Sequence, residues 1–191
     1  MANRSPFPSM AKRSACSLGA VLSAGLLLSG TAMAQPDSLR VAFIEAAPKD
    51  RFILVNGSEC PMSDFKVTID LKGSKAGLLF DTQSGGPGVN VYQPLEVAYG
   101  SEFLTKLPTL QDGDRQAVVE FESLEPGQHV ILTVDVDDTV PSGPMGEQMI
   151  ASSEISGAKV ILDMALLPKT EASFGESGKA LLPVIPGCQI S

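Results

Sequence analysis

The sequence contains few of the residues on which most hydrolases and zinc sites are built. It has no tryptophan, two tyrosines, three cysteines and one histidine in 191 residues. A single histidine and the lack of any Cys-x-x-Cys pair argue against a zinc site with nitrogen and sulfur ligands. No Gly-x-Ser-x-Gly elbow is present to act with His129, which argues against a serine nucleophile. We therefore expect a protein that is not an enzyme, with His129 at the rim of a strand.

Acid pairs leave one catalytic hypothesis open, that of a hydrolase of the cell envelope. Glycosidases use two carboxylates placed on either side of the scissile bond. The absence of tryptophan and the presence of only two tyrosines leave few aromatic surfaces on which a sugar ring would stack. This hypothesis is therefore the third of those considered below.

Positive charge is also scarce. The chain has 14 Lys and Arg against 22 Asp and Glu, which gives a formal net charge of −8. Such a surface repels nucleic acid and anionic lipid, and it favours cations or basic partners, although solubility alone also explains it. After Gly30 no stretch approaches the roughly 18 apolar residues of a membrane helix. The sequence predicts neither nucleic-acid binding nor a membrane span.

The N-terminus has the order of a secretory signal. Three basic residues precede an apolar run, 15–30, and Ala32 and Ala34 form a small-residue cleavage motif. We predict a signal peptide at 1–34 and a mature N-terminus at Gln35. Loss of these three positive charges would take the net charge from −8 to −11. The expected location is secreted or periplasmic.

Two cysteines remain after the predicted signal. Cys60 and Cys188 form an even number in an oxidising compartment, and the simplest prediction is one intramolecular disulfide that ties the C-terminal segment to an early loop. Two free thiols or an intermolecular bridge are the alternatives.

The rest of the chain has the pattern of a β protein. Strict alternation predicts that Phe65, Val67, Ile69 and Leu71 face inward on one strand. The same argument applies to Val130, Leu132, Val134 and Val136. The predicted strands are 39–45, 51–56, 64–71, 77–81, 89–93, 116–122, 129–136, 148–154 and 158–165.

Eighteen glycines and 14 prolines separate these short strands, which favours an all-β fold: a two-sheet antiparallel β-sandwich. The step Leu124-Glu125-Pro126-Gly127 suits a tight turn, with Gly127 at positive φ. It resembles the corner between two strands of immunoglobulin-like and fibronectin-like domains. We predict the sandwich at 35–167 and an extended C-terminal tail at 168–191, docked on it.

Acidic clusters are the candidate sites. Asp135, Asp137 and Asp138 end a strand, and alternation places the first two on one face. Asp112 and Asp114 flank a glycine in a predicted turn. Calcium takes six to eight oxygen ligands from carboxylates and carbonyls, so we treat these five residues as a candidate Ca²⁺ site. The alternative is a solvated strand end and an acidic turn.

Several motifs together resemble small secreted bacterial proteins called "aggregation factor core", named after a calcium-dependent adhesion proteoglycan of sponges. They are Cys60-Pro61, Thr68-Ile69-Asp70-Leu71, Gly77-Leu78-Leu79-Phe80-Asp81, Val91-Tyr92-Gln93-Pro94, Asp112-Gly113-Asp114 and Thr133-Val134-Asp135-Val136-Asp137-Asp138-Thr139, together with residues 43–52. The resemblance spans about 39–165. It implies adhesion to a protein or cell-surface partner, including self-association, with Ca²⁺ as the cation.

The sequence therefore supports two main hypotheses. The first is a secreted, non-enzymatic β-sandwich module for adhesion or self-association, which predicts an exposed sheet edge or apolar patch. The second is a periplasmic binding or accessory module for a small ligand or protein, which predicts one concave pocket.

Overall fold

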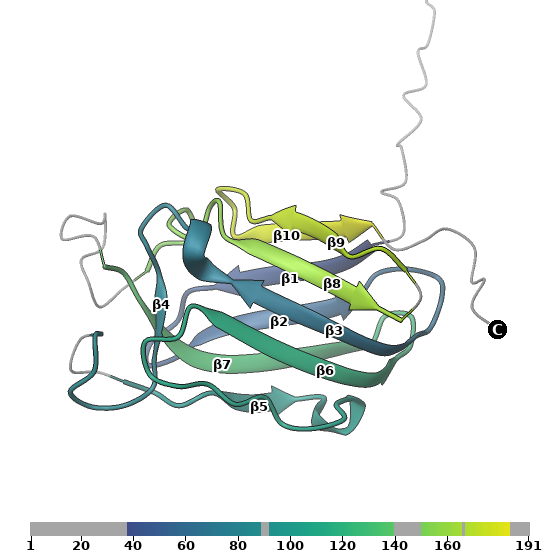
Figure 1. The fold of residues 1–191 in the computed structure, drawn as a ribbon, viewed down its shortest axis with the longest axis horizontal. Coiled ribbons are helices and arrows are strands. Elements are labelled where there is room, and N and C mark those ends of the chain that lie inside the picture. Colours follow the sequence, from purple (N-terminus) through teal and green to yellow (C-terminus); the bar gives the residue numbers. More distant parts are fainter. Residues whose placement is uncertain (1–37, 89–91, 140–149, 166, 184–191) are drawn as a thin grey trace, which may run out of the picture. The chain divides into compact units, whose positions relative to one another are not determined.

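The fold consists of two antiparallel sheets arranged in a sandwich-like manner (Figure 1). A computed structural model describes residues 38–88, 92–139, 150–165 and 167–183, all of which belong to one compact unit. The predicted signal peptide 1–34 lies outside these residues. The only helical elements described are two single 3₁₀ turns, η1 (Leu71–Gly73) and η2 (Ser101–Phe103). The all-β prediction is confirmed for this part of the chain.

The first sheet has the strand order β10-β1-β2-β7-β4, and β5 also pairs with β7. Its strands are β1 (Ser38–Ile44), β2 (Asp50–Asn56), β4 (Leu79–Asp81), β5 (Glu96–Tyr99), β7 (His129–Asp137) and β10 (Lys179–Pro183). One edge of β7 pairs with β2, whereas the other pairs with β5 at residues 131–133 and with β4 at residues 135–137.

The second sheet has the order β6-β3-β8-β9. Its strands are β3 (Met62–Asp70), β6 (Gln116–Leu124), β8 (Lys159–Met164) and β9 (Thr170–Ser173). The chain passes from one sheet to the other between β6 and β7, so that the long strands β6 and β7 lie in different layers.

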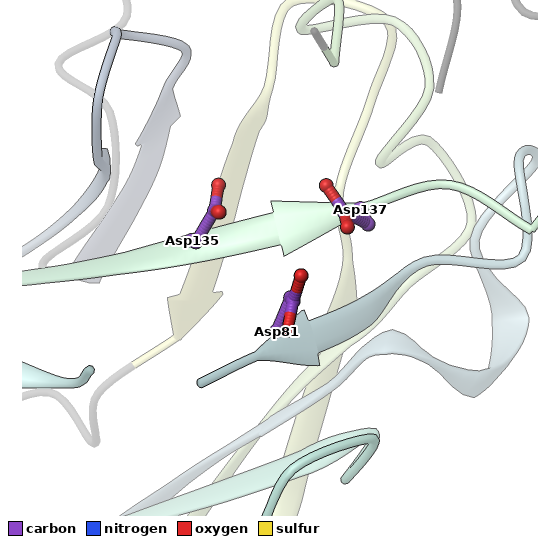
Figure 2. Close-up of side chains that lie close together, drawn as sticks. All are labelled: Asp81, Asp135 and Asp137. Carbon is purple, nitrogen blue, oxygen red and sulfur yellow. The ribbon is translucent and has the colours of Figure 1, made fainter. Parts of the chain in front are cut away.

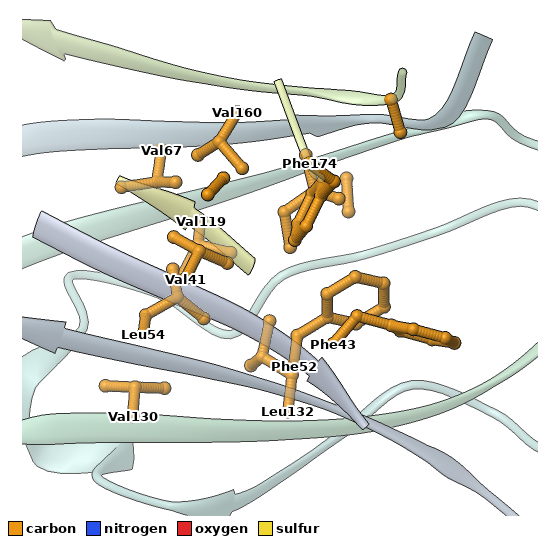
Figure 3. Close-up of a cluster of buried hydrophobic side chains, with 14 of the residues drawn as sticks. Val41, Phe43, Phe52, Leu54, Val67, Val119, Val130, Leu132, Val160 and Phe174 are labelled. Carbon is orange, nitrogen blue, oxygen red and sulfur yellow. The ribbon is translucent and has the colours of Figure 1, made fainter. Parts of the chain in front are cut away.

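Apolar side chains from both sheets fill the space between them (Figure 3). Phe43 and Phe52 of the first sheet pack with ring centroids 5.2 Å apart, and Phe174 lies 6.4 Å from Phe52. All eight predicted inward residues are buried: Phe65, Val67, Ile69, Leu71, Val130, Leu132, Val134 and Val136. The predicted inner faces are therefore confirmed, with Leu71 in η1 and not in a strand.

The predicted turn after β6 is also confirmed. Gln128 donates its backbone N–H to the carbonyl of Glu125 at 3.0 Å, and Gly127 has a φ of 79°. The Gly127 N–H in turn donates to the carbonyl of Asn56 at 2.8 Å. Buried Asn56 also donates its side-chain amide to the carbonyls of Leu124 and Cys60. These bonds join the corner to the loop after β2.

Some predicted elements differ from those observed. Of the predicted strand 148–154, residues 148–149 lie outside the described residues. Residues 150–151 have no regular structure and 152–157 form turns, where Glu154 accepts from the Ala151 amide. The structure adds β5, which has no strict alternation of apolar residues. Of the predicted strand 89–93, residues 89–91 lie outside the described residues.

The segment predicted as an extended tail contributes to both sheets. β9 pairs with β8 in the second sheet, and β10 pairs with β1 in the first. The sheets therefore extend along the chain beyond residue 167, up to Pro183. Residues 184–191, including Cys188, lie outside the described part.

Within the part of the chain that the structure describes, no helix has the length and apolar character needed to cross a membrane.

Candidate metal centre

Three aspartates meet where β4 and β7 lie side by side (Figure 2). Asp81 ends β4, and Asp135 and Asp137 lie at the end of β7. One carboxylate oxygen from each lies within 4.8 Å of one from each of the others. Two oxygens bound to one Ca²⁺ at about 2.3–2.6 Å are no more than about 5 Å apart. The spacing of the three carboxylates therefore fits a single shared ion.

Strand register explains why these residues converge. β4 runs antiparallel to β7, with Asp81 opposite Asp135 and Leu79 opposite Asp137. Side chains two residues apart on a strand share a face, and directly opposed residues on neighbouring strands share one as well. Like charges placed directly opposite each other destabilise a sheet. The backbone thus holds together three acids that repel one another.

The acids lie on the outer face of β7 and are nevertheless buried. Asp81, Asp135 and Asp137 are 1%, 8% and 1% exposed. The alternative of a solvated strand end is therefore wrong. The glycine-rich segment after β4 lies close to two of the acids: a Cβ added to Gly88 would collide with Asp81 and come within 2.5 Å of Oδ2 of Asp137. A side chain at position 88 would therefore force these carboxylates to move.

Several carboxylate oxygens in this cluster are buried without a hydrogen-bond donor. Both oxygens of Asp81 and Oδ2 of Asp135 are in this state. Among the described residues, no lysine or arginine forms an ion pair with Asp81 or Asp135. Buried polar groups nearly always have partners, and a buried unpaired charge is costly. A positively charged ligand would supply the partner that these oxygens lack.

The pKa values of two of the clustered carboxyls are raised by the same burial and proximity. Burial, with a further contribution from the Asp81 carboxylate, raises the pKa of Asp135 to about 7. Burial also raises the pKa of Asp81 well above its usual range, and the neighbouring Asp137 and Asp112 carboxyls add to the rise. Carboxylates with raised pKa values release bound protons when a cation replaces them.

Asp50 is a fourth buried acid near the cluster. Its oxygens accept from the Ala46 amide at 3.1 Å and from the Val136 amide at 3.2 Å. Burial raises the pKa of Asp50 to about 7, the Asp135 and Asp137 charges add to the rise, and the two amide hydrogen bonds oppose it. Both its oxygens accept hydrogen bonds, and Asp50 is not one of the three residues whose oxygens converge.

The predicted acidic turn at 112–114 lies beside β4, which separates it from the end of β7. The backbone of Phe80 pairs with that turn through Asp114 and Gly113, both at 2.9 Å. β4 therefore lies between the turn and β7. Asp112 accepts from the amides of Thr82 and Gln83 at 2.7 and 3.0 Å. It thus fixes the chain that leaves Asp81, and its carboxyl also contacts Asp81.

The other two predicted ligands are placed differently. Asp114 accepts from the Gln111 amide at 2.8 Å within its own turn. Asp138 is buried, but it follows the last residue of β7 and does not belong to the convergent group. Of the predicted set, the structure brings together Asp135 and Asp137, with Asp112 beside them through Asp81.

Sequence reasoning did not identify Asp81 as a site residue. The strand 77–81 was predicted, and its last residue is an aspartate followed by polar and glycine residues. That signal marks a strand end but gives no pairing partner. Only the pairing of β4 with β7 places Asp81 beside Asp135.

The other candidate groups have local structural roles. The ring of His129 stacks on Tyr99 with centroids 4.6 Å apart, at the opposite end of β7 from the acids. Cys60 is buried and disulfide-bonded. Because Cys188 lies outside the described residues, the pairing of these two cysteines stays a prediction. A pocket of about 440 Å³ lies along β5 and is lined by Leu95, Glu96, Val97, Ser101, Leu107 and Pro108.

Comparison with known proteins identifies no relative: no family model, curated protein or solved structure matches this chain.

Proposed function

We propose that this protein is a secreted or periplasmic, non-enzymatic β-sandwich module that acts by adhesion or self-association and needs a divalent cation to do so. The observation that carries the proposal is the buried group of Asp81, Asp135 and Asp137, whose oxygens converge within 4.8 Å. Extracellular sandwich modules use cations at strand ends to fix their loops. The resemblance to the aggregation factor core family supports the same function.

The burial of the acids supports a binding role over catalysis. Each of the three carboxylates is at most 8% exposed, and the backbone at Gly88 lies over two of them. A glycosidase needs its two carboxyls on either side of an accessible sugar. A small ion fits the arrangement, whereas a polymer substrate does not.

Exposed apolar side chains at an edge of the first sheet support association. Tyr99 on β5 is 50% exposed, and Leu107, in the loop that follows, is 63% exposed. In the described part of the chain, β5 pairs with β7 alone. A sheet edge with exposed apolar residues is prone to pair with another chain. We therefore assign the association surface to β5 and Leu107.

We include in the proposal the finer features of the fold. The corner at 124–127, which passes from one sheet to the other, supports an immunoglobulin-like or fibronectin-like sandwich. The net charge of −8 supports a basic or cation-bridged protein partner over nucleic acid. The predicted signal at 1–34 supports export.

The Cys60–Cys188 disulfide would follow from export. It would close a long loop and contribute about 4–5 kcal/mol in the chain-entropy model, and less where the unfolded chain retains structure. Peptide mapping of the non-reduced protein should recover a peptide pair that contains both residues. Alkylation of both thiols without reduction would contradict this pairing.

The mass of the protein in solution tests the proposed function. Light scattering after size exclusion should show a larger species in millimolar Ca²⁺ than in EGTA. Leu107→Glu should reduce that species, because it places a charge in the association surface. Leu181→Glu is the matched control, since Leu181 is 41% exposed on β10, away from β5. A monomer under both conditions would contradict self-association.

The pocket beside β5 favours a second candidate function, that of a binding module for a small apolar ligand. Its lining combines Leu95, Val97 and Leu107 with one acid, Glu96, which is the composition of many ligand sites. Fluorescence of an added apolar dye should rise on binding and fall in Val97→Asp. If the dye response is the same in this variant, the pocket has no such role.

A further inference from the structure

The cluster at the end of β7 has the donor chemistry of a hard-cation site. All three converging groups are carboxylates, and the one histidine lies at the far end of the strand. Oxygen-only sites bind Ca²⁺, Mg²⁺ or Mn²⁺, whereas zinc and copper sites contain nitrogen or sulfur. We propose that Asp81, Asp135 and Asp137 bind one Ca²⁺ ion. This inference deepens the proposed function and rests on it for the use to which the ion is put.

Asp81 provides the independent evidence for a ligand. It is 1% exposed, and neither of its carboxylate oxygens has a hydrogen-bond donor. Its side chain points to the space shared with Asp135 and Asp137 (Figure 2). A purely structural buried aspartate accepts hydrogen bonds, as Asp50 does from two backbone amides. The contrast between Asp50 and Asp81 distinguishes a structural acid from a ligand.

The number of oxygens favours calcium. Three carboxylates supply up to six oxygens when each binds through both, and Ca²⁺ accepts six to eight with irregular geometry. Mg²⁺ requires a near-ideal octahedron and keeps several waters. Burial of the acids and the close approach of the segment at Gly88 leave little space for such a water shell.

Asp112 supports the site by fixing the segment that follows Asp81. It holds the chain after Asp81 through the amides of Thr82 and Gln83. Gly86 also approaches Asp112 so closely that a Cβ there would collide with the carboxylate. The glycines of this segment therefore contact both the predicted ligands and their support. The bound ion joins two strands and this segment into one unit.

The test is calcium binding and its effect on thermal unfolding, with the protein expressed from the full chain. Isothermal titration should detect Ca²⁺ binding after treatment with EGTA. At one hundred times its Kd, Ca²⁺ should raise Tm by roughly 5–10 °C. Mg²⁺ at the same concentration should raise Tm by less. No binding and an unchanged Tm overturn the site, and equal responses to both ions overturn the assignment to calcium.

Variants identify the ligands. Asp81→Asn and Asp137→Asn should each reduce Ca²⁺ affinity at least tenfold, and Gly88→Ala should also reduce it. Asp163→Asn is the control, because Asp163 is an acid of the other sheet whose side chain is 40% exposed and paired with Lys169. Gly175→Ala controls for the glycine, since a Cβ there meets only one backbone atom, at 3.9 Å. Unchanged affinity in Asp81→Asn overturns the ligand assignment.

The calcium site and the proposed self-association can each fail independently of the other. A Ca²⁺-dependent rise in Tm in a protein that stays monomeric supports the site and contradicts self-association. Self-association in Ca²⁺ without loss of binding in Asp81→Asn contradicts the site and leaves the adhesion proposal in place.

Discussion

The two faces of β7 are both buried at its end, but burial of one face favours folding and burial of the other opposes it. The inner face carries Val134 and Val136, which pack between the sheets, whereas the outer face carries Asp135 and Asp137. Removal of the valines from water favours folding. Removal of the aspartates from water opposes it unless a cation compensates. One strand thus contains both a source of stability and a group of acids whose burial lowers stability in the absence of a cation.

Residues that determine the fold and residues that bind an ion should differ in how their effect on stability depends on the ion. A core residue should stabilise the protein in every condition. A ligand residue should destabilise the protein without its ion and stabilise it with the ion. The following predictions apply this criterion, from the largest expected effect to the smallest.

The largest effect should come from the inner face. Leu132→Ala removes a fully buried side chain and should lower the free energy of unfolding by about 2–5 kcal/mol. Urea unfolding should show the same loss in EGTA and in Ca²⁺, because Leu132 belongs to the core between the sheets, whereas Asp135 and Asp137 lie on the other face of β7. Leu107→Ala, at a residue that is 63% exposed, should change stability little. A Leu132→Ala effect that depends on Ca²⁺ would mean that the core and the cluster are coupled.

Substitution of a buried acid should change the free energy of unfolding in the opposite direction to Leu132→Ala. At pH 8 in EGTA, Asp81→Asn should raise the free energy of unfolding by about 1–2 kcal/mol, because an amide of the same shape removes a charge whose pKa is raised by burial; a shift of one pKa unit is about 1.4 kcal/mol. In Ca²⁺ the wild type should be the more stable protein. Asp163→Asn should show no such reversal. If Asp81→Asn is destabilised in EGTA, Asp81 is a structural residue.

Acid pH should stabilise the cation-free protein. Asp50 and Asp135 have folded pKa values of about 7 against an ordinary value of 3.8. Between these values the folded state binds more protons than the unfolded state, so the free energy of unfolding falls as pH rises. The slope is at most about 1.4 kcal/mol per pH unit for each group. Urea unfolding in EGTA at pH 5.5 and pH 8 measures it.

The matched variant for this pH effect is Asp50→Asn, which should have a shallower slope than the wild type. The stabilisation by Ca²⁺ should also be larger at pH 8 than at pH 5.5, because protons and the cation compete for the same oxygens. A wild-type slope of zero in EGTA would contradict the raised pKa values.

The same contrast explains what the sequence could predict. Alternation in 64–71 and 129–136 identified the inner faces, because residues two apart on a strand share a face and the apolar face is buried. The residues Pro126 and Gly127 identified a turn from local backbone preferences. Both inferences depend on neighbours in the sequence, and the structure confirms them.

The rest depends on pairings between distant segments. Nothing in the alternation of 129–136 shows that the backbone at Gly88 lies close to the carboxylate of Asp137. The pairing of Asp81 with Asp135 joins residues far apart in the chain, and so does the contact of Asp112 with the segment after β4. β9 and β10 have only four and five residues, Thr-Glu-Ala-Ser and Lys-Ala-Leu-Leu-Pro, and neither alternates polar with apolar residues, so tertiary pairing determines them. The acidic composition indicated a site, but the pairing of distant strands determines which residues belong to it.

The smallest predicted effect distinguishes the two acids of the predicted turn. Asp112→Asn keeps an acceptor for the amides of Thr82 and Gln83 and should leave folding almost unchanged. It removes a charge beside Asp81 and should weaken Ca²⁺ binding about tenfold, the lower end for residues that orient metal ligands. Asp114→Asn should bind Ca²⁺ as the wild type does, because Asp114 accepts from Gln111 within the turn. Calorimetric titration of both variants decides the matter: equal losses would mean that the turn acts through its total charge and not through the position of Asp112.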